Sequence, residues 1–161
     1  MANNDLLIKL YEMNFKQISE SKSFPEITLR KPIGTDRRLL ISWAQQHFPD
    51  VWLSEIESAL ANTPCSCFIA QQDDSLLGFA CYDATALGFF GPIGVVDEAR
   101  GKGIGRSLAI HCLQDMWLKG YGYAIVGMAN SSAFYHKIAP VIEIPDSDPG
   151  LYRMTNALRK P

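Results

Sequence analysis

Two spacings of apolar residues alternate along the 161-residue chain. Short apolar stretches between turn residues predict β-strands, at residues 6–11, 27–30, 65–71, 76–82, 87–95, 123–128 and 141–144. Apolar residues three or four apart predict helices, at 52–61, 104–119 and 131–137, and in a helix that starts at Thr35 or Asp36 and runs through Ala44. We expect 151–155 to pair beside the last strand. This interleaved order predicts an α/β (α+β) fold.

The strand at 87–95 differs from its neighbours because Gly88, Gly91, Pro92 and Gly94 interrupt it. Glycine and proline weaken a strand inside a sheet, and they mark bulges or the close approach of another chain. We therefore interpret this strand as one that is opened for a ligand.

Length and composition set the class of protein. A chain of 161 residues supports one domain over 1–161, in which 1–24 is expected to be an N-terminal extension that contains a strand. Hydrophobic residues at 47% and charged residues at 20% are typical of a folded globular protein. The net charge of −2 and the lack of a dense basic face argue against nucleic acid as a partner. No apolar stretch reaches bilayer length and no basic segment opens a leader, so we expect a cytoplasmic protein without membrane contact.

The cysteines lie in apolar contexts, at Cys65, Cys67, Cys81 and Cys112. Such cysteines are typical of a reduced core. A metal site would favour Cys-x-x-Cys or paired histidines, whereas the histidines of this chain are scattered singly. No metal is expected.

The most informative motif is Arg100-Gly101-Lys102-Gly103-Ile104-Gly105, which follows an apolar strand and opens the helix at 104–119. Alternate glycines let the backbone turn tightly, so that successive N–H groups converge on one point. The first turn of the helix adds free amides and a positive dipole. Arg100, Lys102 and Arg106 add charge. The loop is therefore expected to bind a phosphate-bearing ligand.

The spacing of the glycines distinguishes between the known types of nucleotide-binding loop. A Walker A loop needs four residues between its first glycine and Gly-Lys-Ser/Thr, which is not met here. The dinucleotide fingerprint needs a glycine three positions after Gly103, where this chain has Arg106. A tight connection with a solvated basic rim stays open as the simplest alternative.

The run from Val95 to Gly105 matches the Arg/Gln-x-x-Gly-x-Gly signature, and over 27–144 the chain resembles the GCN5-related N-acetyltransferases, which bind acetyl-CoA. The resemblance implies the acyl-CoA N-acyltransferase-like fold, with a central mixed, mostly antiparallel sheet that is flanked by helices and splayed at the acetyl-CoA site. By the same resemblance, the strand backbone would contact pantetheine at Ile93, Gly94 and Val95. The loop would bind the pyrophosphate through Arg100, Gly101, Lys102, Gly103, Ile104, Gly105 and Arg106.

A second motif, Phe134-Tyr135-His136-Lys137, looks like the Phe-Tyr-x-Lys of that family. The resemblance places Tyr135 near the thioester, where a phenol can protonate the departing thiolate. A tyrosine packed on the sheet with a solvated hydroxyl is the alternative. Asn130 precedes Tyr135 by five residues instead of the family's seven. It is expected either to meet pantetheine or substrate or to cap the short helix.

Acidic and aromatic residues provide the candidates for the general base and for the acceptor site. Asp83 is a candidate base, with a turn-forming aspartate as the alternative. We expect the acceptor to bind between the first two helices, at His47, Asp50, Trp52 and Glu55. The alternative is that these residues only form a solvated helix face.

The sequence thus predicts an N-acetyltransferase that moves acetyl from acetyl-CoA to a primary amine of a small molecule by direct attack in a ternary complex. A protein or peptide amine is an alternative acceptor. A non-catalytic acyl-CoA-binding or sensing module is an alternative from another class. The resemblance also allows a homodimer.

Overall fold

In the computed structural model, which describes residues 2–16, 25–127, 129 and 132–159, the strands form two antiparallel sheets. The larger has the order β2-β3-β4-β5, from Thr28–Arg30, Cys67–Gln72, Ser75–Tyr82 and Phe90–Val95. The smaller has the order β6-β1-β7, from Tyr123–Val126, Leu6–Lys9 and Val141–Glu143. An isolated parallel bridge between Phe89 and Ile125 connects them. The expected mixed, mostly antiparallel architecture is confirmed.

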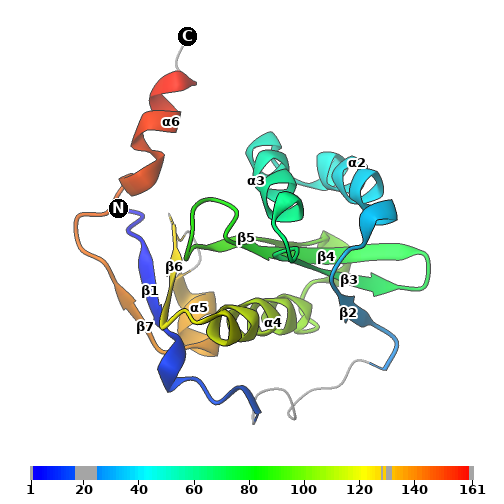
Figure 1. The fold of residues 1–161 in the computed structure, drawn as a ribbon, viewed down its shortest axis with the longest axis horizontal. Helices are drawn as coiled ribbons and strands as arrows, with labels where there is room; N and C mark the ends of the chain where they lie inside the picture. The colour runs from blue at the N-terminus through cyan, green and yellow to red at the C-terminus, as the bar shows by residue number, and fades with distance from the viewer. Residues whose placement is uncertain (1, 17–24, 128, 130–131, 160–161) are drawn as a thin grey trace.

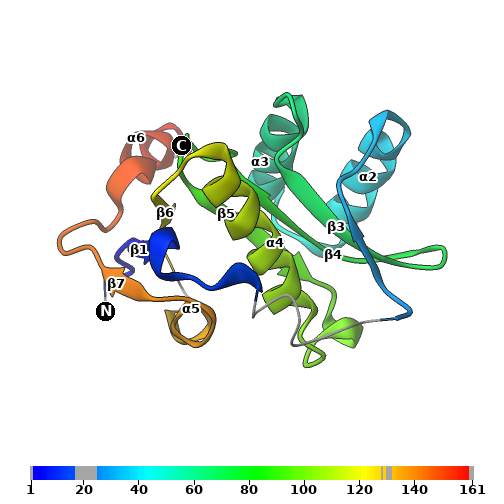
Figure 2. The ribbon, with the colours of Figure 1, turned by 60° about the horizontal axis from the view of Figure 1, so that its bottom comes forward.

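Helices cover both faces of the larger sheet (Figure 1), and Figure 2 shows the same arrangement from a second direction. One face carries α2 (Arg37–His47) and α3 (Asp50–Ala61), and the other carries α4 (Ile104–Lys119). Further helices are α5 (Ser132–Ile138) and α6 (Arg153–Leu158), and there are 3-10 turns at η1 (Leu10–Glu12), η2 (Gly34–Asp36), η3 (Asp97–Ala99) and η4 (Gly150–Tyr152). Within the described ranges, no helix is long and apolar enough to cross a bilayer.

Alternation along β4 divides the core in two. Phe79 and Cys81 belong to the cluster under α2 and α3, while Ala80 and Tyr82 belong to the cluster under α4. Successive strand residues point to opposite faces, so a sheet that is buried on both sides shows this pattern. All four residues are at most 1% exposed. Each large buried side chain of this kind contributes about 1.5–3 kcal/mol to folding.

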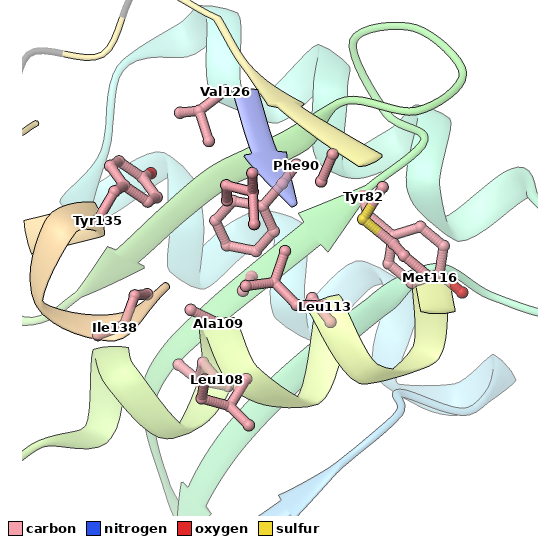
Figure 3. Packing of buried hydrophobic residues seen from close by; sticks show 14 of the residues in the cluster. Tyr82, Phe90, Leu108, Ala109, Leu113, Met116, Val126, Tyr135 and Ile138 are labelled. Carbon is pink, nitrogen blue, oxygen red and sulfur yellow. The ribbon is translucent and has the colours of Figure 1, made fainter. Parts of the chain in front are cut away.

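Helix α4 has the bounds that its sequence predicts. It follows Gly103, which has a left-handed φ of 86°, and it ends at Gly120, with φ 107°. The N–H of Gly120 donates to the carbonyls of Met116 and Trp117, which closes the last turn. On its buried side, Leu113 and Met116 pack with Tyr82 and other residues of the sheet (Figure 3).

The N-terminal strand is the central strand of the smaller sheet. β1 pairs antiparallel with β6, where Leu6 lies opposite Val126, and with β7, where Leu6 lies opposite Glu143. Leu6 and Ile8 are buried. The strand expected near the N-terminus is therefore present, and it contributes Leu6 and Ile8 to the core.

The expectation of a strand at 151–155 is wrong. The chain forms η4 and α6 there, after a turn in which Gly150 has φ 58°. Arginine, methionine, alanine and leucine, which make up most of α6, favour a helix over a strand. In addition, β1 takes the central position of that sheet.

The expected irregularity in the strand at 87–95 is confirmed. β5 begins only at Phe90, and its register against β4 shifts between Ala80 and Tyr82. Ile93 lies opposite Ala80, and Phe90 lies opposite Tyr82, so β5 carries one extra residue at the Gly91–Pro92 step. Such a bulge bends the strand locally.

Candidate functional site

The candidate site is centred on the point where strands β5 and β6 diverge. The two parallel strands are linked by the Phe89–Ile125 bridge and by a hydrogen bond from the Ile125 N–H to the Gly88 carbonyl, with N···O 2.9 Å. In the described part of the chain, β5 is then paired with β4 alone. We call the region beyond the bridge the splay. One edge of β5 is therefore free for hydrogen bonds to a ligand.

The backbone of β5 presents alternate residues to this edge. The Val96 N–H donates to Leu77 of β4, with N···O 2.9 Å. Because antiparallel strands alternate the direction of their polar groups, Gly94 also points its backbone groups at β4, whereas Ile93 and Val95 point theirs into the splay. The Val95 carbonyl accepts a hydrogen bond from Arg100 Nε at 3.2 Å, which agrees with that direction. Of the three predicted pantetheine contacts, these two have suitably directed backbone groups.

The glycine loop lies between β5 and α4. Gly101 and Gly103 have left-handed φ values of 80° and 86°, a conformation that costs other residues about 1–2 kcal/mol. A Cβ at Gly101 would meet nothing within 4 Å. The glycine is thus needed for its backbone conformation, and the space beside it is open. The loop meets the N-terminus of α4, where first-turn amides have no partner inside the helix.

Basic side chains surround this loop. Arg100 is exposed and pairs with Asp97, with N···O 3.2 Å. Lys102 is exposed as well, and Arg106 is half-buried in the first turn of α4. A Cβ on Gly105 would lie in ordinary contact range of Val95 and Phe134. The amides at the helix N-terminus and the cations beside them form a set that fits a pyrophosphate group.

Tyr135 lies on α5 and points into the core. It is 7% exposed, and its ring centroid lies 6.1 Å from Phe90 and 5.1 Å from Phe134. Figure 3 shows it beside Phe90 and Val126, at the ends of the two strands that form the splay. Burial, followed by the nearby Tyr152, raises the pKa of Tyr135. Tyr135 thus lies beside the splay, while its expected place near the thioester stays a prediction, and Asn130 lies outside the described residues.

The predicted acceptor residues come from the α2–α3 corner, and aromatic rings hold that corner on the sheet. Trp52 stacks on Phe48, with centroids 5.4 Å apart and planes 27° from parallel. A Cβ on Gly94 would lie 2.6 Å from a ring atom of Phe48. His47 and Asp50 are exposed beside this cluster. Phe48 was not singled out from the sequence, because its contact with Gly94 of β5 joins residues far apart in the chain.

Glu55 lies apart from this aromatic group, and its side chain contacts the loop that follows β4. Its carboxylate accepts a hydrogen bond from the Thr85 hydroxyl, with Oγ1···Oε1 2.5 Å. Burial raises the pKa of the Glu55 carboxyl, while Thr85 and then Arg159 act against this shift. Thr85 was not singled out from the sequence, because nothing local indicates its contact with a helix thirty residues away.

Asp83 is an anchor for the loop that leads to β5. Its side chain is 1% exposed, and its two oxygens accept hydrogen bonds from the Gly88 N–H, Tyr121 and Lys119, at 2.7 to 3.0 Å. Asp83 has φ 51°, as expected for a turn aspartate. These contacts account for it structurally, so we do not carry it forward as a base.

All four cysteines have free thiols, and Cys67, Cys81 and Cys112 are buried. Burial raises the pKa of the Cys81 and Cys112 thiols well above the usual value. A buried, protonated thiol is a poor nucleophile. The expectation that they belong to the core is confirmed for these three, and Cys65 is half-buried.

Solved structures of acetyltransferases have the same fold. The glucosamine N-acetyltransferase region of a fungal multi-domain β-N-acetylglucosaminidase matches with a TM-score of 0.68 and 16% identity, over 88% of this chain and 19% of that one. The N-acetylglutamate synthase of Neisseria gonorrhoeae, complexed with coenzyme A and N-acetyl-glutamate, matches with a TM-score of 0.58 and 17% identity, over 84% of this chain and 33% of that one. An aminoglycoside N-acetyltransferase in complex with CoA matches with a TM-score of 0.53 and 19% identity, over 72% of this chain and 88% of that one.

The chain thus spans a fifth to a third of the first two of these proteins. A search of curated protein sequences found no significant match. The sequence profile of the Acetyltransferase (GNAT) family, however, matches residues 36–139, from η2 to the end of α5. This match covers most of the chain and includes the glycine loop, both strands of the splay and Tyr135. The chain belongs to the GCN5-related N-acetyltransferase (GNAT) family.

Proposed function

We propose that this protein transfers acetyl from acetyl-CoA to a primary amine of a small molecule, by direct attack in a ternary complex. The observation that carries the proposal is the left-handed glycine loop at the N-terminus of α4, next to the free edge of β5. Family membership supports the acetyl donor. The CoA in two of the solved neighbours supports it as well.

The glycine loop and strand β5 would bind different parts of acetyl-CoA. The amides of 101–106 would bind the pyrophosphate, with Lys102 and Arg106 as the cations that follow it. The backbones of Ile93 and Val95 would hydrogen-bond to the amides of pantetheine. Most of these contacts are made by main chain, so side-chain substitutions in β5 would act through packing more than through lost hydrogen bonds. Bound acetyl-CoA supplies the reactive thioester.

Tyr135 is the proposed general acid. Burial disfavours a phenolate, so the hydroxyl of Tyr135 stays protonated at neutral pH. A protonated hydroxyl beside the thioester sulfur can donate to the thiolate as it leaves. The packing of the ring against Phe90 and Phe134 fixes the direction of that donor.

Direct attack is favoured over a covalent cysteine route. An acetyl-cysteine intermediate needs an accessible thiolate next to a base. Cys81 and Cys112 are fully buried, and burial keeps their thiols protonated. We therefore assign no nucleophilic role to the protein.

A thiol-release assay with acetyl-CoA tests the proposal, with spermidine, glucosamine, glutamate and a lysine peptide as acceptors. Turnover on one of them, lowered about 100-fold or more in Tyr135→Phe, is the expected result for a general acid. Tyr123→Phe, an exposed tyrosine on β6, serves as the control. Tight CoA binding by calorimetry together with no turnover on any amine would favour the non-catalytic binding module instead.

A further inference from the structure

The carboxylate of Asp83 lies close to the bridge between the two sheets, and the proposed reaction does not use it. One of its oxygens accepts a hydrogen bond from the Gly88 N–H at 2.7 Å, and the other pairs with Lys119 Nζ at 2.9 Å. The Tyr121 hydroxyl lies 2.9 Å and 3.0 Å from the two oxygens. A carboxylate that is 1% exposed is tolerated when its oxygens are satisfied in this way. We call these four residues the clamp.

The clamp joins segments that are far apart in the chain. Asp83 directly follows β4, and Gly88 lies in the loop that leads to β5. Lys119 is the last residue of α4, and Tyr121 lies in the connection from α4 to β6. One carboxylate therefore holds the chain just before β5 and just before β6, which are the two strands that form the splay.

Gly88 connects the clamp to the start of the splay. Its N–H donates to Asp83, and its carbonyl accepts the Ile125 N–H of β6, with N···O 2.9 Å. The N–H of Asp83 donates in turn to the carbonyl of Phe89, also at 2.9 Å, and Phe89 is the residue that bridges Ile125. The point at which β5 and β6 diverge is therefore fixed by residues that Asp83 binds directly.

The ring of Tyr121 supports Gly88 by packing as well. Gly88 has a left-handed φ of 84°, and a Cβ there would lie 3.6 Å from a ring atom of Tyr121. The N–H of Tyr121 donates to the Met116 carbonyl at 3.0 Å, which holds this residue at the end of α4. Tyr121 thus has a ring beside Gly88 and a hydroxyl on Asp83, and Tyr121→Phe removes only the second contact.

Helix α4 extends this arrangement to the glycine loop. A Cβ on Gly105, in its first turn, would lie 3.6 Å from Val95 at the end of β5. Lys119, at its other end, is tied to Asp83 ahead of β5. The helix has 16 residues and is about 24 Å long. It runs along the larger sheet (Figure 1), so it sets the spacing between the glycine loop and the start of the splay.

We propose that the clamp positions the splay for the pantetheine arm of acetyl-CoA, with Asp83 as the positioning residue that acts through Gly88. This inference rests on the proposed function, in which the glycine loop binds the pyrophosphate and β5 binds pantetheine. A ligand that is held at both places needs the two at a fixed spacing, and a site that already has this spacing binds more tightly. Loss of the clamp is therefore expected to weaken the pantetheine contacts and to leave the pyrophosphate contacts intact.

Calorimetry with two ligands tests this expectation. CoA occupies both parts of the site, whereas 3′-phospho-ADP has the adenine nucleotide and pyrophosphate of CoA without pantetheine. Asp83→Gly removes the carboxylate, and glycine adopts the φ of 51° at this position without strain. This variant is expected to bind CoA about 10-fold or more weakly than wild type and to bind 3′-phospho-ADP as wild type does. A merely structural loss would weaken both ligands alike.

Further variants grade the effect. Asp83→Asn keeps an oxygen for the Gly88 N–H and tolerates the left-handed backbone, so its loss of CoA affinity should be smaller than that of Asp83→Gly. Tyr121→Phe should weaken CoA about 2- to 5-fold, and it carries the test if Asp83→Gly does not fold. Tyr82→Phe is the matched control, because it removes a hydrogen bond between the Tyr82 hydroxyl and Asp115 of α4. It should bind both ligands as wild type does.

The outcomes separate this proposal from the proposed function. Clamp variants that bind CoA within twofold of wild type would overturn the positioning role, and so would equal weakening of CoA and 3′-phospho-ADP. A wild type that does not bind CoA would overturn both proposals. A wild type that binds CoA but acetylates no amine would contradict acetyl transfer, and the calorimetry would still decide on the clamp. With an active wild type, Asp83→Gly should raise the KM for acetyl-CoA and leave the KM for the amine unchanged.

Discussion

Substitution of Gly94 by alanine offers a sharp test of how the α2–α3 corner is held on β5. An added Cβ would lie 2.6 Å and 2.8 Å from two ring atoms of Phe48 and 3.0 Å from a ring atom of Phe79. Neither ring can retreat freely. Phe48 packs at 5.3 to 5.4 Å, between centroids, against Trp43, Trp52 and Phe79.

The magnitude follows from overpacking in a full core, which costs about 1–3 kcal/mol. For a chain of this size, each kcal/mol lowers the melting temperature by about 2–4 °C. We therefore expect Gly94→Ala to lower the melting temperature by about 4–8 °C, for a cost near the middle of that range. If the corner shifts, the acceptor KM should rise while CoA binding changes little, since the backbone of Gly94 points at β4.

Thermal melts of Gly94→Ala in wild-type and Phe48→Leu backgrounds measure this effect. Leucine removes the ring atoms that the new methyl would meet, so the penalty of Gly94→Ala should fall by about 1 kcal/mol or more in the second background. Gly122→Ala is the control, because a Cβ there would meet nothing within 4 Å. Equal penalties in both backgrounds, or no penalty at all, would refute the packing described for Phe48.

Three further outcomes follow from the fold. Asp83→Asn should lower the free energy of unfolding by about 1–3 kcal/mol, since it breaks the pair with Lys119, and a urea midpoint equal to wild type would refute the anchor. Deletion of residues 1–12 removes the central strand of the smaller sheet, so the product should lose cooperative melting; a wild-type melting curve would argue against that role. Asp36→Asn should lower the melting temperature at pH 7, because Arg30 holds the pKa of that carboxyl below its usual range. The difference should shrink as the pH falls through that lowered pKa, and melts at a series of pH values check it.

Local signals in the sequence predicted the parts of the fold that depend on neighbours in the chain. Helix α4 has its predicted bounds because left-handed glycines flank it and apolar residues recur at helical spacing between them. The bulge in β5 followed from Gly91 and Pro92. The place of β1 between β6 and β7 could not be predicted in this way, since pairing between residues more than a hundred positions apart has no local signature.

The residues of the candidate site also differ in whether a local sequence signal predicts them. The glycine loop and Tyr135 were found because their spacing is a motif. Phe48 and Thr85 were missed because each gains its meaning from a contact across the fold. Glu55 was found among acidic residues on a helix, but the sequence could not separate it from a solvated face. The hydrogen bond between Glu55 and Thr85 distinguishes Glu55 from a residue on a solvated helix face.

A crystal structure of the protein with CoA would test the central claim most directly, which is that the loop and the splay together hold acetyl-CoA. The account predicts the pyrophosphate on the amides of 101–106, pantetheine hydrogen-bonded to the backbones of Ile93 and Val95, and the sulfur within hydrogen-bond reach of the Tyr135 hydroxyl. CoA bound elsewhere on the chain, or with its pantetheine arm outside the splay, would contradict it.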